Sequence, residues 1–393
     1  MISGFTVWAF WIAVGLIVYT YAGYVVWLQL RAWLRPRVVK RAANEPMVSV
    51  LMVVRNEEAA LRGKLENLLK LDYPAELCQI VVVSDGSTDG TENILREYAG
   101  NPRIHVVLNQ LSRGKAAGLN DGMAMVQGDI VLFTDARQYI ESDALRLLME
   151  SFVDPKVGAV SGELMLGDPR KGESYRGMGL YWQVEKRIRE LESAGGSVVG
   201  ATGALYAVRR ELVVEVPADT LIDDVYTPMH VVRQGARVLF DPRAKAWDIP
   251  NLGEQREFRR KVRTLTGNYQ LLQLSPWLLG VGNPIWFEFV SHKLMRLLAP
   301  FLLLIALITS WFLPGDFYRT LFWMQVAAYG LSVLGWMRLK LGPFSRLTNA
   351  AYIFAALNVA ALLAFGNFVT RRKEIWVQPQ PGLRGELRKE QRA

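Results

Sequence analysis

The sequence predicts an α/β domain built on a parallel sheet and set between apolar segments that are long enough to cross a membrane. Between about residues 46 and 265, short apolar strands alternate with stretches of helical spacing, and this alternation favours parallel strands with helices packed on them. Near both ends lie long apolar runs, and the chain as a whole is 51% apolar. A transmembrane helix needs about 20 such residues.

The N-terminal segment, residues 1–30, has no charged side chain. A cleaved signal peptide has a basic start and a short apolar core, and this segment has neither, so we expect a transmembrane helix. Five basic residues follow between 31 and 41. Cytoplasmic flanks carry such an excess of Lys and Arg. We therefore expect the α/β domain in the cytoplasm, and the protein in a membrane with several spans, in bacteria the inner membrane.

Three further apolar runs lie in the segment 297–370, where we expect two or three transmembrane helices. They are residues 297–313, 321–337 and 347–370. The third run has an alternative: if it spans, the basic tail 371–393 lies on the side that the positive-inside rule disfavours, so the run is either a span, a re-entrant segment or an interfacial helix. The segment 276–296 mixes aromatic and basic residues and predicts an interfacial helix.

Charge and cysteine content restrict the class of protein. The 46 Lys and Arg exceed the 37 Asp and Glu, for a net charge of +9, which suits an anionic lipid or a phosphate-bearing substrate as well as a nucleic acid. The basic residues gather beside the apolar runs rather than on an aromatic face, which argues against nucleic acid. Cys78 is the single cysteine, so no internal disulfide forms, and the three histidines have no zinc-site spacing.

Polar residues follow successive predicted strands, where ligands bind in open α/β sheets. Arg55, Asn56 and Glu57 follow the strand 48–54, Asp85 follows the strand 80–84, and Asp135 follows the strand 129–134. Each has another interpretation: Asp85 precedes Gly86 in a turn, and Asp135 can cap a helix. Their joint placement at neighbouring strand ends favours one ligand-binding crevice.

Lys115 stands in the string SRGKAAGLN, which has some features of a phosphate-binding loop. The loop pattern fails, because Asn109 stands where its first glycine belongs and Ala116 replaces the Ser or Thr that holds magnesium. Lys115 is then either a single cation beside a diphosphate or a solvated lysine at a helix start. No Gly-x-Gly-x-x-Gly follows the first strand, which argues against a dinucleotide cofactor.

The strings VRNEE, VVVSDGSTDGT, GKAAGLN, FTDAR, TGALYAVRREL, LIDDVYTPM and RRKVRT, in this order, resemble family 2 glycosyltransferases. The resemblance covers roughly residues 46–265, and it is greatest to the membrane-embedded group of cellulose, chitin and hyaluronan synthases. It implies a GT-A fold, a Rossmann-like mixed sheet with flanking helices, between N-terminal and C-terminal transmembrane helices.

The resemblance also implies roles for single residues. The positions that bind the nucleoside in the family are matched by Arg55, Asn56, Glu57 and Asp85, and an element lining the same pocket is matched by Lys115 and Asn120. Asp135 matches the metal ligand for Mg²⁺ or Mn²⁺, and Asp224 matches the catalytic base. Gly203 matches the acceptor-side motif, and the (Q/R)xxRW motif is matched by Arg260 and Arg263. The neighbouring Asp223 is an alternative base, and the Asp pair can also cap the following helix.

Two positions depart from the family pattern. The DxD motif here reads Asp135-Ala136-Arg137, so a guanidinium replaces the second carboxylate. Magnesium tolerates one carboxylate supplemented by phosphate oxygens and water, and Arg137 can contact the diphosphate itself. Thr264 replaces the Trp of (Q/R)xxRW, which weakens the implication of processive polymerisation.

The function implied is inverting transfer of a sugar from a nucleotide sugar, a UDP-sugar by preference, to a saccharide acceptor in polysaccharide or envelope synthesis. One alternative is a single transfer to a lipid such as a sphingolipid, diacylglycerol or polyprenyl phosphate. Another, of a different class, is a non-catalytic membrane scaffold subunit. The partners expected are the donor, the saccharide or lipid acceptor, the membrane and an export partner.

Overall fold

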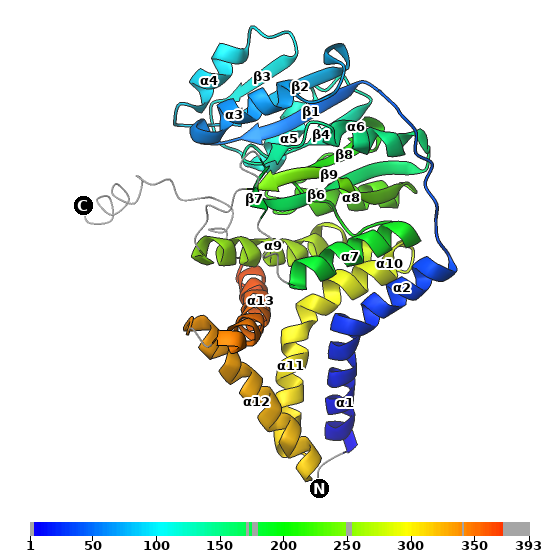
Figure 1. Cartoon of the computed structure of the whole chain (residues 1–393), viewed down its shortest axis with the longest axis vertical. Helices are drawn as coiled ribbons and strands as arrows, with labels where there is room; N and C mark the ends of the chain where they lie inside the picture. Colours follow the sequence, from blue (N-terminus) through cyan, green and yellow to red (C-terminus); the bar gives the residue numbers. More distant parts are fainter. Residues whose placement is uncertain (1–3, 170–172, 175–179, 249–253, 340–341, 372–393) are drawn as a thin grey trace, which may run out of the picture.

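The computed structural model describes the chain apart from residues 1–3, 170–172, 175–179, 249–253, 340–341 and 372–393. The tail 371–393 lies almost wholly outside these described residues. Figure 1 shows the α/β domain at one end of the molecule, apolar helices at the other, and a layer of helices between them.

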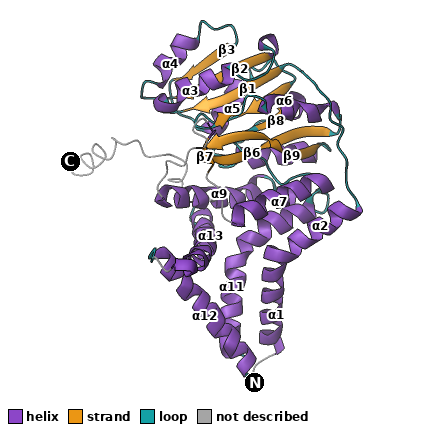
Figure 2. Ribbon diagram, viewed as in Figure 1, coloured by secondary structure: helices purple, strands orange, loops and turns teal. Residues whose placement is uncertain are grey.

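A mixed sheet forms the centre of the α/β domain, in the order β3-β2-β1-β4-β8-β6-β9-β5, with β7 paired to β6 (Figure 2). The strands are β1 (Val48–Val54), β2 (Cys78–Asp85), β3 (Ile104–Asn109), β4 (Ile130–Phe133), β5 (Tyr139–Ile140), β6 (Val157–Asp168), β7 (Glu173–Ser174), β8 (Tyr206–Arg209) and β9 (Arg237–Asp248). Strands β1 to β4 are parallel to one another. Beyond them β8 runs antiparallel to β4 and β6, and β6 and β9 are again parallel to each other, so the sheet is mixed.

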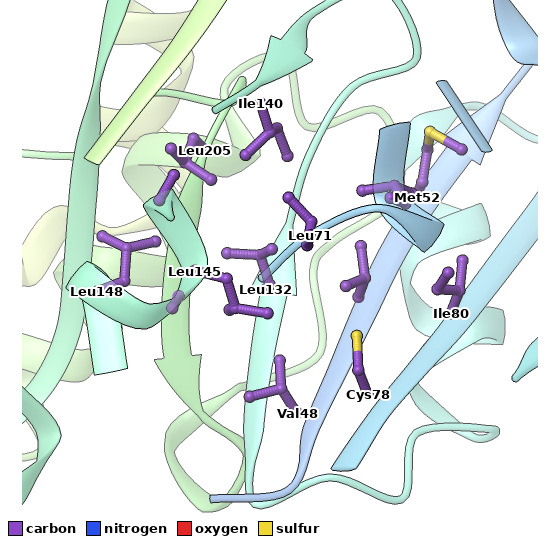
Figure 3. Close-up of a cluster of buried hydrophobic side chains, with 14 of the residues drawn as sticks. Val48, Met52, Leu71, Cys78, Ile80, Leu132, Ile140, Leu145, Leu148 and Leu205 are labelled. Carbon is purple, nitrogen blue, oxygen red and sulfur yellow. The ribbon is translucent and has the colours of Figure 1, made fainter. Parts of the chain in front are cut away.

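Helices cover both faces of this sheet, and alternate residues of β1 face the two cores. Val48 and Met52 join one core (Figure 3), which α3 covers with Leu65. Leu51 joins the other core, to which α5 contributes Leu119. The helices of the domain are α3 (Glu58–Leu69), α4 (Thr91–Tyr98), α5 (Lys115–Met123), α6 (Ala144–Met149), α7 (Leu180–Gly195), α8 (Asp223–Arg233) and α9 (Glu254–Leu274). Burial of each such aliphatic side chain contributes about 1.5–3 kcal/mol to the stability of the fold. This packing fixes the sheet that positions the site.

Three helical segments of the described chain are long and apolar enough to cross a membrane: Gly4–Leu34, Trp286–Phe312 and Gly342–Val369. The apolar helices are α1 (Gly4–Val18), α2 (Tyr24–Leu34), α10 (Trp286–Phe289), α11 (Met295–Phe312), α12 (Asp316–Trp336) and α13 (Ser345–Val369). Short π-helical stretches join α1 to α2 and α10 to α11. The second segment begins at Trp286, inside the expected interfacial helix 276–296, which starts as a single 3₁₀ turn. An interfacial position for that segment stays a prediction, as does a spanning position for the third apolar run.

A buried polar network joins the α/β domain to the apolar helices. Glu192 of α7 accepts a hydrogen bond from the Tyr24 hydroxyl at 2.7 Å and lies 2.7 Å from Nδ1 of His292. The other ring nitrogen of His292 lies 2.8 Å from Glu185, which also accepts a bond from Arg296 at 2.6 Å. Because buried charges are costly unless they are paired, these contacts hold α7 against the helix that begins at Trp286.

Candidate active site

The parallel pairing of β1, β2 and β4 brings their carboxyl ends to one edge of the sheet. The loop after β1 begins with Arg55, which is half-buried. Asn56 follows in the left-handed backbone region, with φ of 54°, a conformation that Asn tolerates better than most residues. Its side-chain oxygen accepts the Thr88 N–H at 2.7 Å. The first two loops of the predicted crevice are therefore bonded to each other.

Glu57 and Arg137 form an ion pair across this edge. The Arg137 Nη2 lies 2.8 Å from Glu57 Oε1, and its Nε donates to the same carboxylate at 2.9 and 3.0 Å. The hydrogen bond to Glu57 is the main cause that raises the pKa of Arg137. The guanidinium that replaces the second DxD carboxylate is thus held by Glu57 and does not contact Asp135 through a hydrogen bond among the described groups.

Asp85 ends β2 with its side chain nearly fully buried. Its two oxygens accept bonds from the Ser112 hydroxyl at 2.7 Å and from the backbone N–H groups of Arg113 at 2.7 Å and Gly114 at 2.9 Å. These are the residues immediately before Lys115. In this structure Asp85 therefore acts on the site by fixing the loop that starts α5.

Lys115, at the start of α5, bridges two carboxylates. Its ammonium lies 3.0 Å from Asp135 Oδ1 and 3.2 Å from Asp223 Oδ2. Burial acts to lower the pKa of Lys115, but the charges of Asp135, Asp223 and Asp224 outweigh it, so the pKa is raised. The lysine is the cation of an acidic cluster rather than a solvated charge, the alternative that the sequence left open.

Gly203 lies between the two carboxylates that carry the predicted chemistry. Its N–H donates to Asp224 Oδ2 at 3.1 Å. A Cβ atom on Gly203 would lie 3.4 Å from Asp224 Oδ2 and 3.5 Å from Asp135 Oδ2. The missing side chain therefore leaves open the space in front of both carboxylates, where a reacting group can enter.

The Asp pair begins α8, where a helix N-terminus favours negative charge. Asp223 is 6% exposed and is bound to Lys115. Burial first, and then the charge of Asp223, raise the pKa of Asp224 to about 6. The two side chains differ in partner, as adjacent residues on one backbone commonly do: Asp223 faces the cation, and Asp224 faces Gly203.

The remaining predicted residues lie outside this cluster. Asn120 exchanges two hydrogen bonds of 2.9 Å with the backbone of Val216, so its amide joins α5 to a neighbouring loop. Arg260 of α9 pairs with Glu257 at 3.0 Å, and Arg263 is exposed on the same helix. The structure brings together Lys115, Asp135, Gly203, Asp223 and Asp224, with the pair of Glu57 and Arg137 beside them.

Asp248, at the end of β9, was missed by the sequence reasoning. Burial raises its pKa, a hydrogen bond from Gln138 and the charges of Arg260 and Arg137 lower it, and the charge of Asp135 raises it. The charges that act on its carboxyl group therefore come from Arg137 and Asp135 of the site and from Arg260 of α9. The signal was present, because Asp248 stands at the carboxyl end of a strand, close to where Asp135 stands relative to β4, but β9 itself was not predicted.

The donor set fits a divalent metal only in part. Carboxylate oxygens suit Mg²⁺ and Mn²⁺. Among the residues that the structure describes, no group of three or more His, Cys, Asp or Glu side chains could hold a metal ion. The Oδ1 atom of Asp135 forms an ion pair with the Lys115 ammonium, and its Oδ2 atom faces Gly203. It fits as one ligand of a metal whose other ligands come from a diphosphate and water.

Comparison with known proteins places this geometry in a family context. Residues 49–216 match the model of "Glycosyl transferase family 2". The chain is 26% identical over 234 residues to a poly-beta-1,6-N-acetyl-D-glucosamine synthase of Staphylococcus aureus, covering 57% of this chain and 55% of that protein. A synthase of the same name from Staphylococcus epidermidis is 25% identical over 239 residues, covering 58% of this chain and 56% of that protein. The chain thus spans about half the length of these relatives.

One solved structure shares most of the fold. A mannosyltransferase from Pyrobaculum calidifontis, in complex with GDP-Man and Mn²⁺, superposes with a TM-score of 0.71 at 22% identity, covering 92% of this chain and 99% of that one. The shared fold confirms the mixed sheet with flanking helices that the resemblance implied. At this identity it shows the fold alone.

Proposed function

The chain carries a glycosyltransferase domain of family 2, and from that premise we propose that it transfers a sugar from a nucleotide sugar, with inversion, to a saccharide acceptor in polysaccharide or envelope synthesis. The observation that carries the proposal is the cluster of Lys115, Asp135, Gly203 and Asp224 at the carboxyl ends of the sheet. It places a cation, the carboxylate that we propose as a metal ligand, and a second carboxylate with a raised pKa around one open space.

We assign the donor to the UDP-sugars, with UDP-N-acetylglucosamine to be tested first. The support is the name of the relatives, which are synthases of a polymer of N-acetylglucosamine. The mannosyltransferase with the same fold was solved with GDP-Man and Mn²⁺, so GDP-sugars and Mn²⁺ belong in the same test.

Asp224 is the proposed general base. Its Oδ2 accepts the Gly203 N–H, and among the residues that the structure describes no hydrogen-bond donor is placed on Oδ1. A carboxyl with a pKa near 6 is ionised at neutral pH and is a stronger base than an ordinary aspartate. Asp223 is the weaker candidate, because it is buried and bound to Lys115. Asp224 would take the proton of the acceptor hydroxyl as that oxygen bonds to the anomeric carbon and the bond to the diphosphate breaks.

The leaving diphosphate gains negative charge, and cations fixed in advance stabilise such charge. Lys115 supplies one, held in place by two carboxylates and by the loop that Asp85 fixes. Arg260 and Arg263 on α9 are the further candidates. A divalent metal at Asp135 would supply Lewis-acid stabilisation of the diphosphate oxygens. Direct displacement by one base predicts a β-linked product from an α-linked donor.

The test compares Asp224→Asn with Asp223→Asn in the purified full-length protein. We expect Asp224→Asn to lower kcat by about 10²–10⁴ with little change in melting temperature, the range typical of a lost general base. Asp223→Asn should lower stability as well, because Lys115 loses a partner. NMR of the product should show a β-linkage. An α-linked product, or a larger kcat loss in Asp223→Asn, would refute these roles.

A further inference from the structure

A groove of about 690 Å³ lies where α9, the end of α12 and the middle of α13 meet. Figure 1 shows α12 and α13 on the side of α9 away from the sheet. Its volume is within the usual range for small-molecule sites, roughly 300–1,000 Å³. The lining residues that carry the inference are Phe258, Arg259, Val333, Trp336, Ala356 and Val359.

Close contacts between the helices at both ends of the groove fix the positions of its walls. At one end α12 and α13 touch closely, because a methyl group on Gly335 would collide with the Thr348 carbonyl, and the Ser332 hydroxyl lies 3.2 Å from the Ala351 carbonyl oxygen. At the other end Tyr269 of α9 stacks on Phe368 of α13 with ring centres 5.7 Å apart. The groove is therefore built into the packing of three helices.

The apolar part of the groove is formed by exposed side chains of α12 and α13. Trp336 is 68% exposed, Val333 53% and Val359 47%, and α13 lies in a segment apolar enough to cross a membrane. In water such a surface would be costly. Beside a bilayer it is covered by lipid chains, and Ala356 leaves room for a chain to lie against α13.

A cation stands at the end of the groove that α9 forms. Arg259 is exposed, and within the described part of the chain no carboxylate forms an ion pair with it, whereas its neighbour Arg260 is paired with Glu257 at 3.0 Å. Guanidinium groups bind phosphates through paired N–H donors. Basic residues beside membrane helices attract anionic lipids by about 1 kcal/mol each.

We propose that this groove binds one phosphate-bearing lipid, with its phosphate on Arg259 and a hydrocarbon chain between α12 and α13. Charge complementarity and the apolar lining together select this occupant, because a soluble peptide would leave the chain-sized apolar part uncovered. The lipid would also contact α9, whose next residue, Arg260, acts through its charge on Asp248 of the candidate active site. The inference goes beyond the proposed function and does not depend on it.

The probe is phosphatidic acid, added to the delipidated full-length protein in detergent, with bound lipid counted by native mass spectrometry. We expect one saturable equivalent. Arg259→Gln and Ala356→Trp should each weaken binding about tenfold, the first by removing a charged hydrogen bond and the second by filling the groove. Arg259→Lys should retain most of the affinity. Arg259 is exposed, so its substitution leaves the core intact.

Matched controls lie on the same helices but outside the groove. Ile353→Trp places the same indole side chain at an exposed position of α13, and Arg319→Gln removes an exposed arginine from the far end of α12; both should bind phosphatidic acid as the wild type does. Equal binding by Arg259→Gln and the wild type would overturn the proposal. So would equally tight binding of diacylglycerol, which lacks the phosphate, or displacement of the lipid by inorganic phosphate alone. None of these binding measurements requires a nucleotide sugar, so their outcome is independent of the proposed transferase activity.

Discussion

Replacing Lys115 with methionine removes the ammonium group that separates the site's carboxylates, at 3.0 Å from Asp135 and 3.2 Å from Asp223. An exposed ion pair contributes ~0.2–1 kcal/mol, whereas removing one partner of a buried pair costs ~3–5 kcal/mol. The side chains of Lys115 and Asp135 are 36% and 41% exposed, but the side chain of Asp223 is only 8% exposed. Discounting for solvent screening, we expect a loss of about 1–2 kcal/mol in the free energy of unfolding.

The assay is thermal unfolding of the detergent-solubilised protein, followed by tryptophan fluorescence with and without Mn²⁺. The variant should melt a few degrees below the wild type. Mn²⁺ should raise its Tm by more than it raises that of the wild type, because a divalent cation can then take the place of the ammonium between the carboxylates. A ligand that binds only the folded state raises the free energy of unfolding by RT ln(1 + L/Kd), where L is the free ligand concentration.

Lys186→Met is the matched control. Lys186 lies 2.9 Å from Glu163, with 40% and 7% of the two side chains exposed, so the pair resembles that of Lys115 and Asp223 but has a single carboxylate. It should lose a similar stability and recover none of it with Mn²⁺. The reasoning would be refuted if Lys115→Met were as stable as the wild type, or if Mn²⁺ raised the Tm of both variants equally.

Three further outcomes follow from the site. The raised pKa of Asp224 places the ionised, active base above about pH 6, so kcat/KM should fall tenfold per unit as pH drops below that value; a flat profile down to pH 5 would exclude Asp224 as the base. Arg137→Asp restores a second carboxylate and frees Glu57 from its ion pair, so the Mn²⁺ concentration needed for half-maximal activity should fall. An unchanged or higher concentration would count against Asp135 as a metal ligand. Gly203→Ala places a methyl group at van der Waals distance from Asp135 and Asp224, so activity should fall at least about tenfold while Tm stays within about 2 °C; full activity in this variant would show that the space is not used.

Sequence patterns predicted the half of the fold in which local signals agree. Strands β1, β2 and β4 are short apolar runs bounded by turn residues, and polar residues stand directly after them. Because parallel strands share one ligand-binding edge, this pattern predicted that Asp135 lies beside the loops after β1 and β2. The start of α8 at Asp223 was likewise visible as an Asp pair ahead of a helical stretch.

The rest depends on contacts between residues far apart in the chain. No local pattern shows that Lys115 meets Asp223, 108 positions later, or that Asn120 binds the backbone of Val216 rather than a ligand. The antiparallel strand β8 has four residues, too few for a periodic signal. Asp248 escaped notice because β9, like β8, was not predicted, although its position at the carboxyl end of a strand follows the same rule as that of Asp135.

The most direct test of the central claim is nucleotide release by the purified full-length protein across a panel of UDP- and GDP-sugars, with an acceptor extract supplied. The account predicts release from one UDP-sugar, suppressed by EDTA through loss of the metal at Asp135 and abolished by Asp224→Asn. Release that persists undiminished in Asp224→Asn, or no release from any donor, would contradict it.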